Sequence, residues 1–313
     1  MSAAFLIKTS SLLFSTIVFS LLMVFTKPVG AEEPLVGTME TLNPRALGMA
    51  GAMVAGPAGT SAIYLNPATI SMSPLYHFEG MYQFTARENM HMGGLSVADS
   101  VTTVVGAGLS FNYSGIDQSR TKHQAYDARL SLSGAIGKMF FLGATGRYLR
   151  LEQNIESSKW GPVGRPALPA SGSQQVDGFT FDAGAALKLG EMISLGVAGY
   201  NLTHTQSVFA PIALTGGVAV SLMEMLLLEA DVKTDFTSHD EAGVDIRVGG
   251  ELFLAGALAL RAGYLYDVYF NMHALSLGAG YVHSRFALDA GFTQEFRHNG
   301  RIAVAIGFKI FVN

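Results

Sequence analysis

From residue 75 to the C-terminus, apolar and polar residues alternate through a long series of short segments, each about ten to thirteen residues long and separated by glycine-containing turns. Side chains alternate across a β-strand, so each segment predicts a strand with one apolar and one polar face. In one example, Leu226, Leu228, Ala230, Val232, Thr234 and Phe236 alternate with Glu229, Asp231, Lys233 and Asp235. A transmembrane β-barrel has this pattern, and a soluble β-sandwich has the same parity.

The composition favours the membrane. Of the 313 residues, 49% are hydrophobic and only 14% are charged, which leaves too little polar surface for an ordinary soluble domain of this size. After the N-terminal region, no stretch of about twenty uninterrupted apolar residues is present, so helical spans are excluded. A closed antiparallel barrel is then the remaining way to satisfy the backbone within a bilayer. The final segment, which contains Phe308, Ile310, Phe311 and Val312, resembles the C-terminal signal of such barrels, with Asn313 in place of the usual terminal aromatic residue.

The N-terminus predicts export. Lys8 precedes an apolar stretch from Leu12 to Phe25, and small residues follow at Val29 and Ala31. This order predicts a secretory signal peptide over residues 1–31, although an uncleaved anchor is the alternative. The absence of cysteine fits an exported chain, and the net charge of −4 gives no reason to expect nucleic acid as a partner.

Alternation and turn residues predict about fourteen strands, an even number as expected for a single-chain bacterial barrel. The predicted ranges are 75–86, 90–98, 103–114, 124–137, 140–152, 176–189, 192–203, 211–223, 226–237, 242–254, 257–267, 272–283, 285–296 and 300–312. Very short turns, such as 137–139 and 190–192, are expected at the periplasmic end. The polar connections near 115–123, 204–210 and 238–241 are expected at the other end. Residues Gln153 to Gln175 form the one long predicted loop, and the only tryptophan, Trp160, makes it a candidate external lid.

Residues 32–74 form a segment that a plain porin would not need, and we expect them to plug the barrel. Two motifs lie in this segment, at 45–52 (Arg-Ala-Leu-Gly-Met-Ala-Gly-Ala) and at 66–68 (Asn-Pro-Ala). Their small residues permit close packing inside a lumen, and the proline after Asn66 fixes the backbone on the way into the first strand. The sequence therefore predicts three parts: a signal peptide (1–31), a hatch (32–74) and a barrel (75–313).

These motifs resemble the N-terminus of the FadL family of outer-membrane channels and of its compact PorV-like relatives. The residues that carry the resemblance are Arg45, Ala46, Gly48, Gly51, Ala52, Ala62, Asn66, Pro67 and Ala68, and the segment 199–203 (Gly-Tyr-Asn-Leu-Thr) is similar to part of the PorV-like barrels. The resemblance implies a fourteen-stranded barrel with a luminal hatch, located in the outer membrane. It implies passive passage of hydrophobic small molecules, either long-chain fatty acids or aromatic hydrocarbons. It leaves open a second role, as a docking or assembly partner of a secretion or surface-attachment machine.

Charged residues of both signs occur on the predicted inner faces, which favours ion pairs that fill the barrel over a charge-selective pore. Arg147 and Arg261 are candidates to meet a fatty-acid carboxylate, and Trp160 is a candidate contact in the long loop. No nucleophile elbow, phosphate-binding loop or metal-ligand spacing is present, so no enzyme activity, cofactor or metal is predicted. The expected partners are outer-membrane lipid and a hydrophobic ligand. A general aqueous porin is disfavoured because of the predicted plug.

Overall fold

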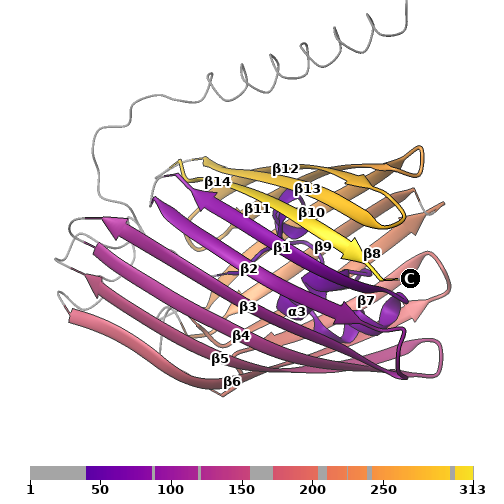
Figure 1. Cartoon of the computed structure of the whole chain (residues 1–313), viewed down its shortest axis with the longest axis horizontal. Helices are drawn as coiled ribbons and strands as arrows, with labels where there is room; N and C mark the ends of the chain where they lie inside the picture. The colour runs from indigo at the N-terminus through magenta and orange to yellow at the C-terminus, as the bar shows by residue number, and fades with distance from the viewer. Residues whose placement is uncertain are drawn as a thin grey trace, which may run out of the picture. The chain divides into compact units, whose positions relative to one another are not determined.

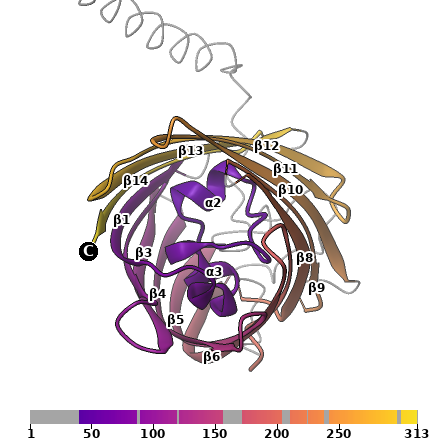
Figure 2. The same cartoon turned by 90° about the vertical axis from the view of Figure 1, so that its right-hand side faces the viewer.

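The barrel is closed and antiparallel. The computed structural model describes residues 40–86, 89–118, 121–155, 172–203, 210–223, 225–237, 242–296 and 300–312. Within these residues, fourteen strands pair in sequence order around a ring, and β1 (Tyr76–Thr85) pairs with β14 (Ile302–Phe311) to close it. The predicted fold class, an all-β antiparallel barrel of fourteen strands, is confirmed (Figures 1 and 2).

The remaining elements follow the predicted order. The other strands are β2 (Met90–Asp99), β3 (Val105–Gln118), β4 (Thr121–Ile136), β5 (Phe140–Ile155), β6 (Gly172–Leu189), β7 (Ile193–Tyr200), β8 (Ala213–Leu222), β9 (Leu226–Asp235), β10 (Gly243–Leu254), β11 (Leu258–Asp267), β12 (Met272–Val282) and β13 (Phe286–Phe296). Short helical turns precede β1: α2 (Pro44–Gly48), η1 (Gly59–Ser61), α3 (Ala62–Leu65) and η2 (Pro67–Met72). No helix in the described ranges is long and apolar enough to span a membrane.

The outer surface of the barrel is apolar around the whole ring. Each strand contributes at least one exposed, large apolar side chain, for example Phe78, Leu95, Leu109, Leu130, Leu142, Phe181, Val197, Leu214, Leu228, Val248, Leu260, Leu277, Leu288 and Ile306. The opposite faces carry buried polar and charged residues, such as Glu79, Arg129 and Glu229. A sheet that is apolar outside and polar inside is solvated by lipid on its outer face, so the parity of the sequence here describes a membrane barrel.

Tight turns gather at the end of the barrel where β1 begins and β14 ends. The amide of Val312 donates to the carbonyl of Tyr76 across this closure, at 2.8 Å. Glycines with positive φ stand in the turns at Gly137, Gly190 and Gly256, a conformation that glycine adopts at little cost. Because bacterial barrels place their short turns in the periplasm, we refer to this end as the periplasmic end and to the opposite one as the external end.

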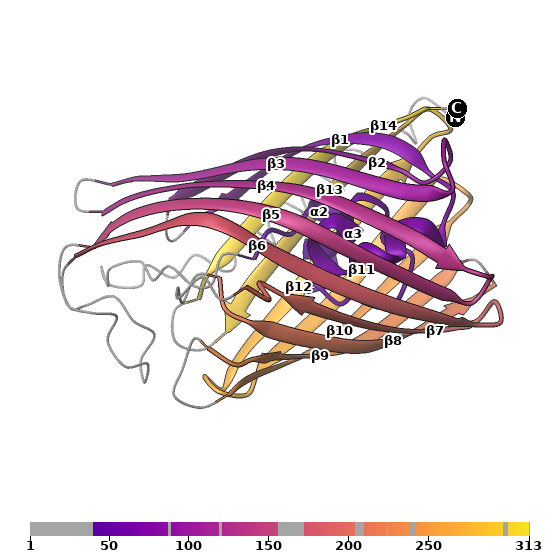
Figure 3. The same cartoon turned by 90° about the horizontal axis from the view of Figure 1, so that it is seen from below.

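Four neighbouring strands are longer than predicted at the external end. The sequence predicts a connection at 115–123, but β3 continues to Gln118 and β4 begins at Thr121. Similarly, the predicted loop 153–175 is too long, because β5 continues to Ile155 and pairs with β6 from Gly172. Trp160 lies outside the described residues. The polar composition of these stretches predicted loops. In the structure, their backbone N–H and C=O groups are instead satisfied by strand pairing at the external end. As a result, β3 to β6 extend beyond their neighbours (Figure 3).

The segment from Glu40 to Ser73, which we call the luminal segment, lies inside the ring. Figure 2 shows α2 and α3 surrounded by the strands. Its apolar side chains form a core within the barrel, and Met49, Met53 and Ile63 are each at most 1% exposed. None of its helical turns exceeds six residues, so the fold of the segment depends on contacts with the wall.

Candidate functional site

An arginine fixes the first helical turn of the luminal segment to the wall. The Arg45 guanidinium donates two hydrogen bonds to Glu251, from Nε at 2.9 Å and from Nη2 at 2.8 Å, and a third to the carbonyl of Pro57 at 3.2 Å. Glu251 also accepts from Arg261 at 2.5 Å, and Arg261 reaches Asp289 at 2.7 Å. Paired donors on one carboxylate fix orientation as well as position, so the bond from Arg45 to Glu251 of β10 orients α2, which itself packs mainly against β12 and β13.

The ion pairs continue around the wall to β1. Lys309 contacts Asp289 at 2.9 Å and Glu79 at 3.6 Å. Glu79 in turn accepts from Asn43 Nδ2 at 2.9 Å and from the hydroxyl of Thr60. The predicted pairing of luminal charges is therefore observed, and the luminal segment takes part in it.

Two glycines allow α2 and the turn after it to approach the wall. A Cβ on Gly48 would lie 3.0 Å from the Cα of Gly278. Gly51 has φ of +76°, and a Cβ there would lie 2.6 Å from Nη1 of Arg247. Both glycines of the 45–52 motif are thus explained by close packing and, for Gly51, by a left-handed backbone.

Replacing Gly51 with alanine is expected to lower the free energy of unfolding by about 1–2 kcal/mol, because an L-residue is strained at positive φ. Denaturant titration of the purified barrel, followed by the heat-modifiable migration of folded barrels in electrophoresis, measures the loss. Gly216→Ala is the matched control, since a Cβ at Gly216 meets nothing within 4 Å. Equal stability of the two variants would contradict the explanation.

Two carboxylates of β9 hold the backbone of the luminal segment. Glu229 accepts from the amides of Ala55 and Gly56, the latter at 3.1 and 3.2 Å. Asp231 accepts from the amide of Val54 at 3.1 Å. Both residues are about 2% exposed. Their carboxylates therefore supply the hydrogen-bond acceptors that water would otherwise provide to these buried amides.

The Asn66-Pro67-Ala68 motif anchors the other end of the segment. The Asn66 side chain accepts from the amide of Ala68 at 3.1 Å and donates to the carbonyls of Val54 at 2.7 Å and Ala185 at 3.2 Å. The asparagine thus caps η2 and also joins the segment to itself and to β6. Pro67 opens η2, where its missing N–H removes no hydrogen bond.

A ring of charges lies on the external side of the luminal segment. Asp127 accepts from Arg129 at 2.9 to 3.2 Å and from Arg147 at 2.8 and 3.0 Å. Arg129 also faces Asp182 at 3.6 Å, and Arg147 donates to Asn201 at 2.8 Å. We call Asp127, Arg129, Arg147 and Asp182 the charged ring. Its four charges cancel, which matches the predicted filling role better than a selective pore.

Glu40 enters a second cluster at the same level. It contacts Arg247 at 2.8 Å and Lys233 at 3.3 Å, and Arg247 also pairs with Asp245 at 2.9 Å. Burial alone would raise the pKa of Glu40, but Arg247 and then Lys233 outweigh it and hold the pKa well below the usual 4.5. A carboxylate whose pKa is lowered on folding stabilises the fold above its unfolded pKa, so this contact is expected to weaken only as the pH falls below about 4.5.

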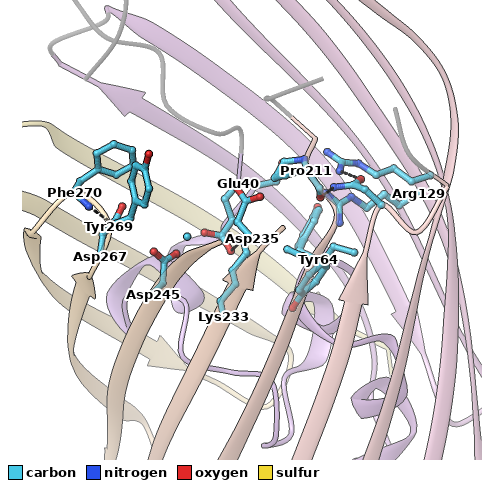
Figure 4. Close-up of a pocket in the computed structure, with 16 residues that line it drawn as sticks. Glu40, Tyr64, Arg129, Pro211, Lys233, Asp235, Asp245, Asp267, Tyr269 and Phe270 are labelled. Carbon is cyan, nitrogen blue, oxygen red and sulfur yellow. Dashed lines mark hydrogen bonds and ion pairs between the residues drawn. The ribbon is translucent and has the colours of Figure 1, made fainter. Parts of the chain in front are cut away.

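A polar pocket lies between the two clusters. It is lined by Glu40, Thr41, Tyr64, Arg129, Arg147, Tyr200, Asn201, Pro211, Ala213, Lys233, Asp235, Gly243, Asp245, Asp267, Tyr269 and Phe270 (Figure 4). Arg129 lies over the ring of Tyr64 at 5.2 Å, and Lys233 over the ring of Tyr200 at 5.5 Å. The pocket has a volume of about 90 Å³, which is room for a few water molecules. It is smaller than a cavity of about 150 Å³ that can bind benzene. A larger molecule can occupy it only if its lining moves.

Above the charged ring, the inner face of the extended strands is apolar. Ala125, Leu149, Leu151 and Val176 are buried there together with Ala210. Along β5 the inward residues change from Leu151 and Leu149 to Arg147 within four positions. The long strands therefore carry an apolar layer at the external end and the charged ring directly beneath it.

The candidate residues predicted from sequence lie in three places. The residues predicted for a hatch all contact the wall or fix a turn of the luminal segment, and their role as a hatch stays a prediction: Arg45, Gly48, Gly51, Asn66, Pro67 and Ala68. Arg147 lines the pocket, whereas Arg261 lies among Glu251 and Asp289 and is not part of the pocket lining. A substrate contact for either arginine stays a prediction.

Two residues of this region were not singled out from sequence. Glu40 precedes the two motifs of the luminal segment and is not part of any sequence motif or alternating segment. Asn201 lies in the noted segment 199–203, has φ of +52°, and bridges Arg147 to the carbonyl of Pro211 at 2.9 Å. Asparagine adopts the left-handed conformation more readily than most residues, so an asparagine between a strand and a loop was the sequence feature that could have predicted it. No group of metal-ligating side chains is present in the described part of the chain.

The fold defines the class of the protein as a β-barrel with an N-terminal segment inside its lumen. Comparison with known proteins and solved structures shows which barrels share this fold. No protein-family model matches the chain, and no curated protein matches its sequence. The solved structure of the toluene transporter TbuX of Ralstonia pickettii matches with a TM-score of 0.71 and 13% identity, over 88% of this chain and 99% of that one. The toluene transporter TodX of Pseudomonas putida matches with a TM-score of 0.68 and 15% identity, over 88% and 100%. A FadL homologue of Pseudomonas aeruginosa matches with a TM-score of 0.64 and 16% identity, over 88% and 99%. The chain thus has the fold of the FadL-type channels, as its N-terminal motifs predicted.

Proposed function

We propose that this protein is an outer-membrane channel of the FadL type, through which hydrophobic small molecules enter by passive diffusion. The apolar layer at the external end carries the proposal. Ala125, Leu149, Leu151 and Val176 face inward at a level where an aqueous pore would present polar groups. These side chains are at most 7% exposed, so an apolar molecule that leaves water can bind among them, before it meets the polar lumen, once the groups that cover them move.

The charged ring suggests the substrate class. An amphiphile whose tail lies against Leu149 and Leu151 would place its head group at Arg147 and Arg129. A carboxylate could exchange for Asp127 as the partner of these guanidinium groups, whereas an unsubstituted hydrocarbon could not. We therefore favour long-chain fatty acids over aromatic hydrocarbons such as the toluene named for TbuX and TodX.

Passage also requires that the luminal segment act as a hatch. The pocket beside it is small, and its lining includes Glu40 and Thr41, which belong to the segment itself. The ties at Arg45, Asn66 and the β9 carboxylates hold the remainder of the segment. The part nearest Glu40, which is held to the wall by the ion pairs of Glu40 with Arg247 and Lys233, is the part that we expect to move.

The double variant Asp127→Asn/Arg147→Gln is expected to lower uptake of a labelled long-chain fatty acid about tenfold and to leave uptake of labelled toluene unchanged, since it removes one cation while keeping the ring neutral. Both uptakes are measured in cells that make equal amounts of folded barrel. Lys138→Gln, which removes an exposed cation from the turn between β4 and β5, is the control. Equal effects on the acid and the hydrocarbon would contradict the assignment of the head group.

A further inference from the structure

A groove of about 890 Å³ lies on the outer wall of the barrel. Its walls are mainly outward-facing apolar side chains of β1, β2 and β12 to β14, among them Tyr82, Leu95, Leu288, Ile306 and Phe308. The groove is open along its outer side, so it can hold one face of an apolar molecule but does not enclose one. Because the groove opens on the lipid-facing surface, it is filled by part of a lipid unless another apolar molecule or protein displaces it.

Two outward-facing glycines form the floor of the groove. Gly80 pairs with Leu95 on one side and with Phe308 on the other, and Gly93 pairs with Tyr82. A Cβ on Gly93 would meet nothing within 4 Å, and one on Gly80 would meet only a methyl group of Leu95, at 3.6 Å. No neighbour fills the space above these glycines, and a larger residue could occupy it without displacing the backbone.

A cation lies in the periplasmic turn beside the groove, outside its lining. The rings of Tyr281 and Phe308, which line the groove, lie 6.1 and 6.2 Å from the ring of Phe286. Arg285 directly precedes Phe286 in the exposed turn after β12, and none of the described residues provides an ion-pair partner for its guanidinium. His283 packs on Phe286 in the same turn, at 5.0 Å. An unpaired arginine at a membrane interface favours a phosphate.

We propose that this groove is a binding site for one phospholipid of the periplasmic leaflet, with an acyl chain over Gly80 and Gly93 and the phosphate at Arg285. The dimensions agree. Ile310 pairs with Phe286 beside the turn, and Ile306 pairs with Tyr82 near the far end of the groove. Four strand residues separate these levels, about 14 Å along a strand, or about 10–11 Å along the membrane normal at the usual strand tilt, which fits within one half of the roughly 30 Å hydrocarbon core. One leaflet therefore spans the groove from its cation to its far end.

The test is native mass spectrometry of the full-length barrel, extracted in mild detergent and titrated with vesicles of a synthetic phosphatidylglycerol. The intact protein should retain one phospholipid at activation energies that strip the others. Gly80→Leu/Gly93→Leu should lower the retained fraction at least about tenfold, because it fills the site, and Arg285→Gln should lower it about fivefold. Heat-modifiable migration in electrophoresis confirms that each variant is folded.

Two matched controls separate a site from the general lipid shell. Gly216→Leu adds the same side chain at an exposed, open position on β8, seven strands around the ring, and Lys138→Gln removes an exposed charge from the turn between β4 and β5. Both should retain the phospholipid. Retention by the groove variant equal to that of the intact protein would overturn the proposal, as would an equal loss in the controls. A dimer that disappears with the groove variant would instead identify a second barrel as the occupant.

Fatty-acid uptake measured on the same variants distinguishes this proposal from the channel function. Retained lipid that is lost while uptake persists supports the lipid site and leaves the channel untouched. Uptake that is lost while the lipid is retained would assign the groove to the substrate and overturn the lipid site.

Discussion

Substitution of Asp127 by asparagine is expected to lower the free energy of unfolding of the barrel by about 3–5 kcal/mol, the usual cost of removing one partner from a buried ion pair. The Asp127 side chain is 4% exposed and binds two guanidinium groups that are each 5% exposed. After the change, Arg129 keeps Asp182, at 3.6 Å, and the ring of Tyr64, and Arg147 keeps Asn201. Denaturant titration read by heat-modifiable migration measures the loss.

The double variant Asp127→Asn/Arg147→Gln provides the control for this effect. It removes one charge of each sign, so at least half of the lost stability should return. If the single and double variants were equally destabilised, the uncompensated arginine could not be the cause, and a general packing defect would explain the result.

Deletion of Thr41 to Gly59 is expected to turn the barrel into an open ion-conducting pore. These residues include α2 and the stretch held by Glu229 and Asp231, and they occupy the interior of the ring. A fourteen-stranded barrel without an internal segment leaves room for water, so single-channel conductance in a planar bilayer should rise at least about tenfold.

The deletion also leaves several wall carboxylates without their donors. A second version that adds Glu229→Gln and Asp231→Asn removes two of these uncompensated charges and should fold more readily, with the same conductance. Conductance of the folded deletion variants equal to that of the intact barrel would show that the luminal segment does not close the lumen.

The fold was predictable because its main signal is periodic. Alternation in segments such as 226–236 marks both the strand and the face that lipid covers, and the tight turns fix the order. The extensions of β3 to β6 were missed because residues such as Asp117, Lys122 and Gln153 are polar, and polarity alone does not distinguish a loop from a strand paired outside the membrane.

The site was predictable only in part. The motifs of the luminal segment could be located from sequence because Gly51 takes a left-handed backbone conformation that favours glycine, and Asn66 caps the turn that follows it. The partners of Arg45 and Arg147 could not be assigned, since Glu251 and Asp127 come together with them only through register and closure of the ring. The apolar layer at Leu149 and Leu151 was also missed. These leucines lie on the same inward face of β5 as Arg147, where alternation alone predicts polar residues.

The most direct test of the channel function is uptake of a labelled long-chain fatty acid by cells that make the intact protein, compared with cells that lack it and with cells that make a folded variant carrying Leu149→Asn/Leu151→Asn. We expect uptake that depends on the protein and that falls at least about fivefold when the apolar layer becomes polar. Absence of protein-dependent uptake of the acid or of toluene, from a barrel shown to be folded in the outer membrane, would contradict it and favour a docking role in a secretion or surface-attachment machine.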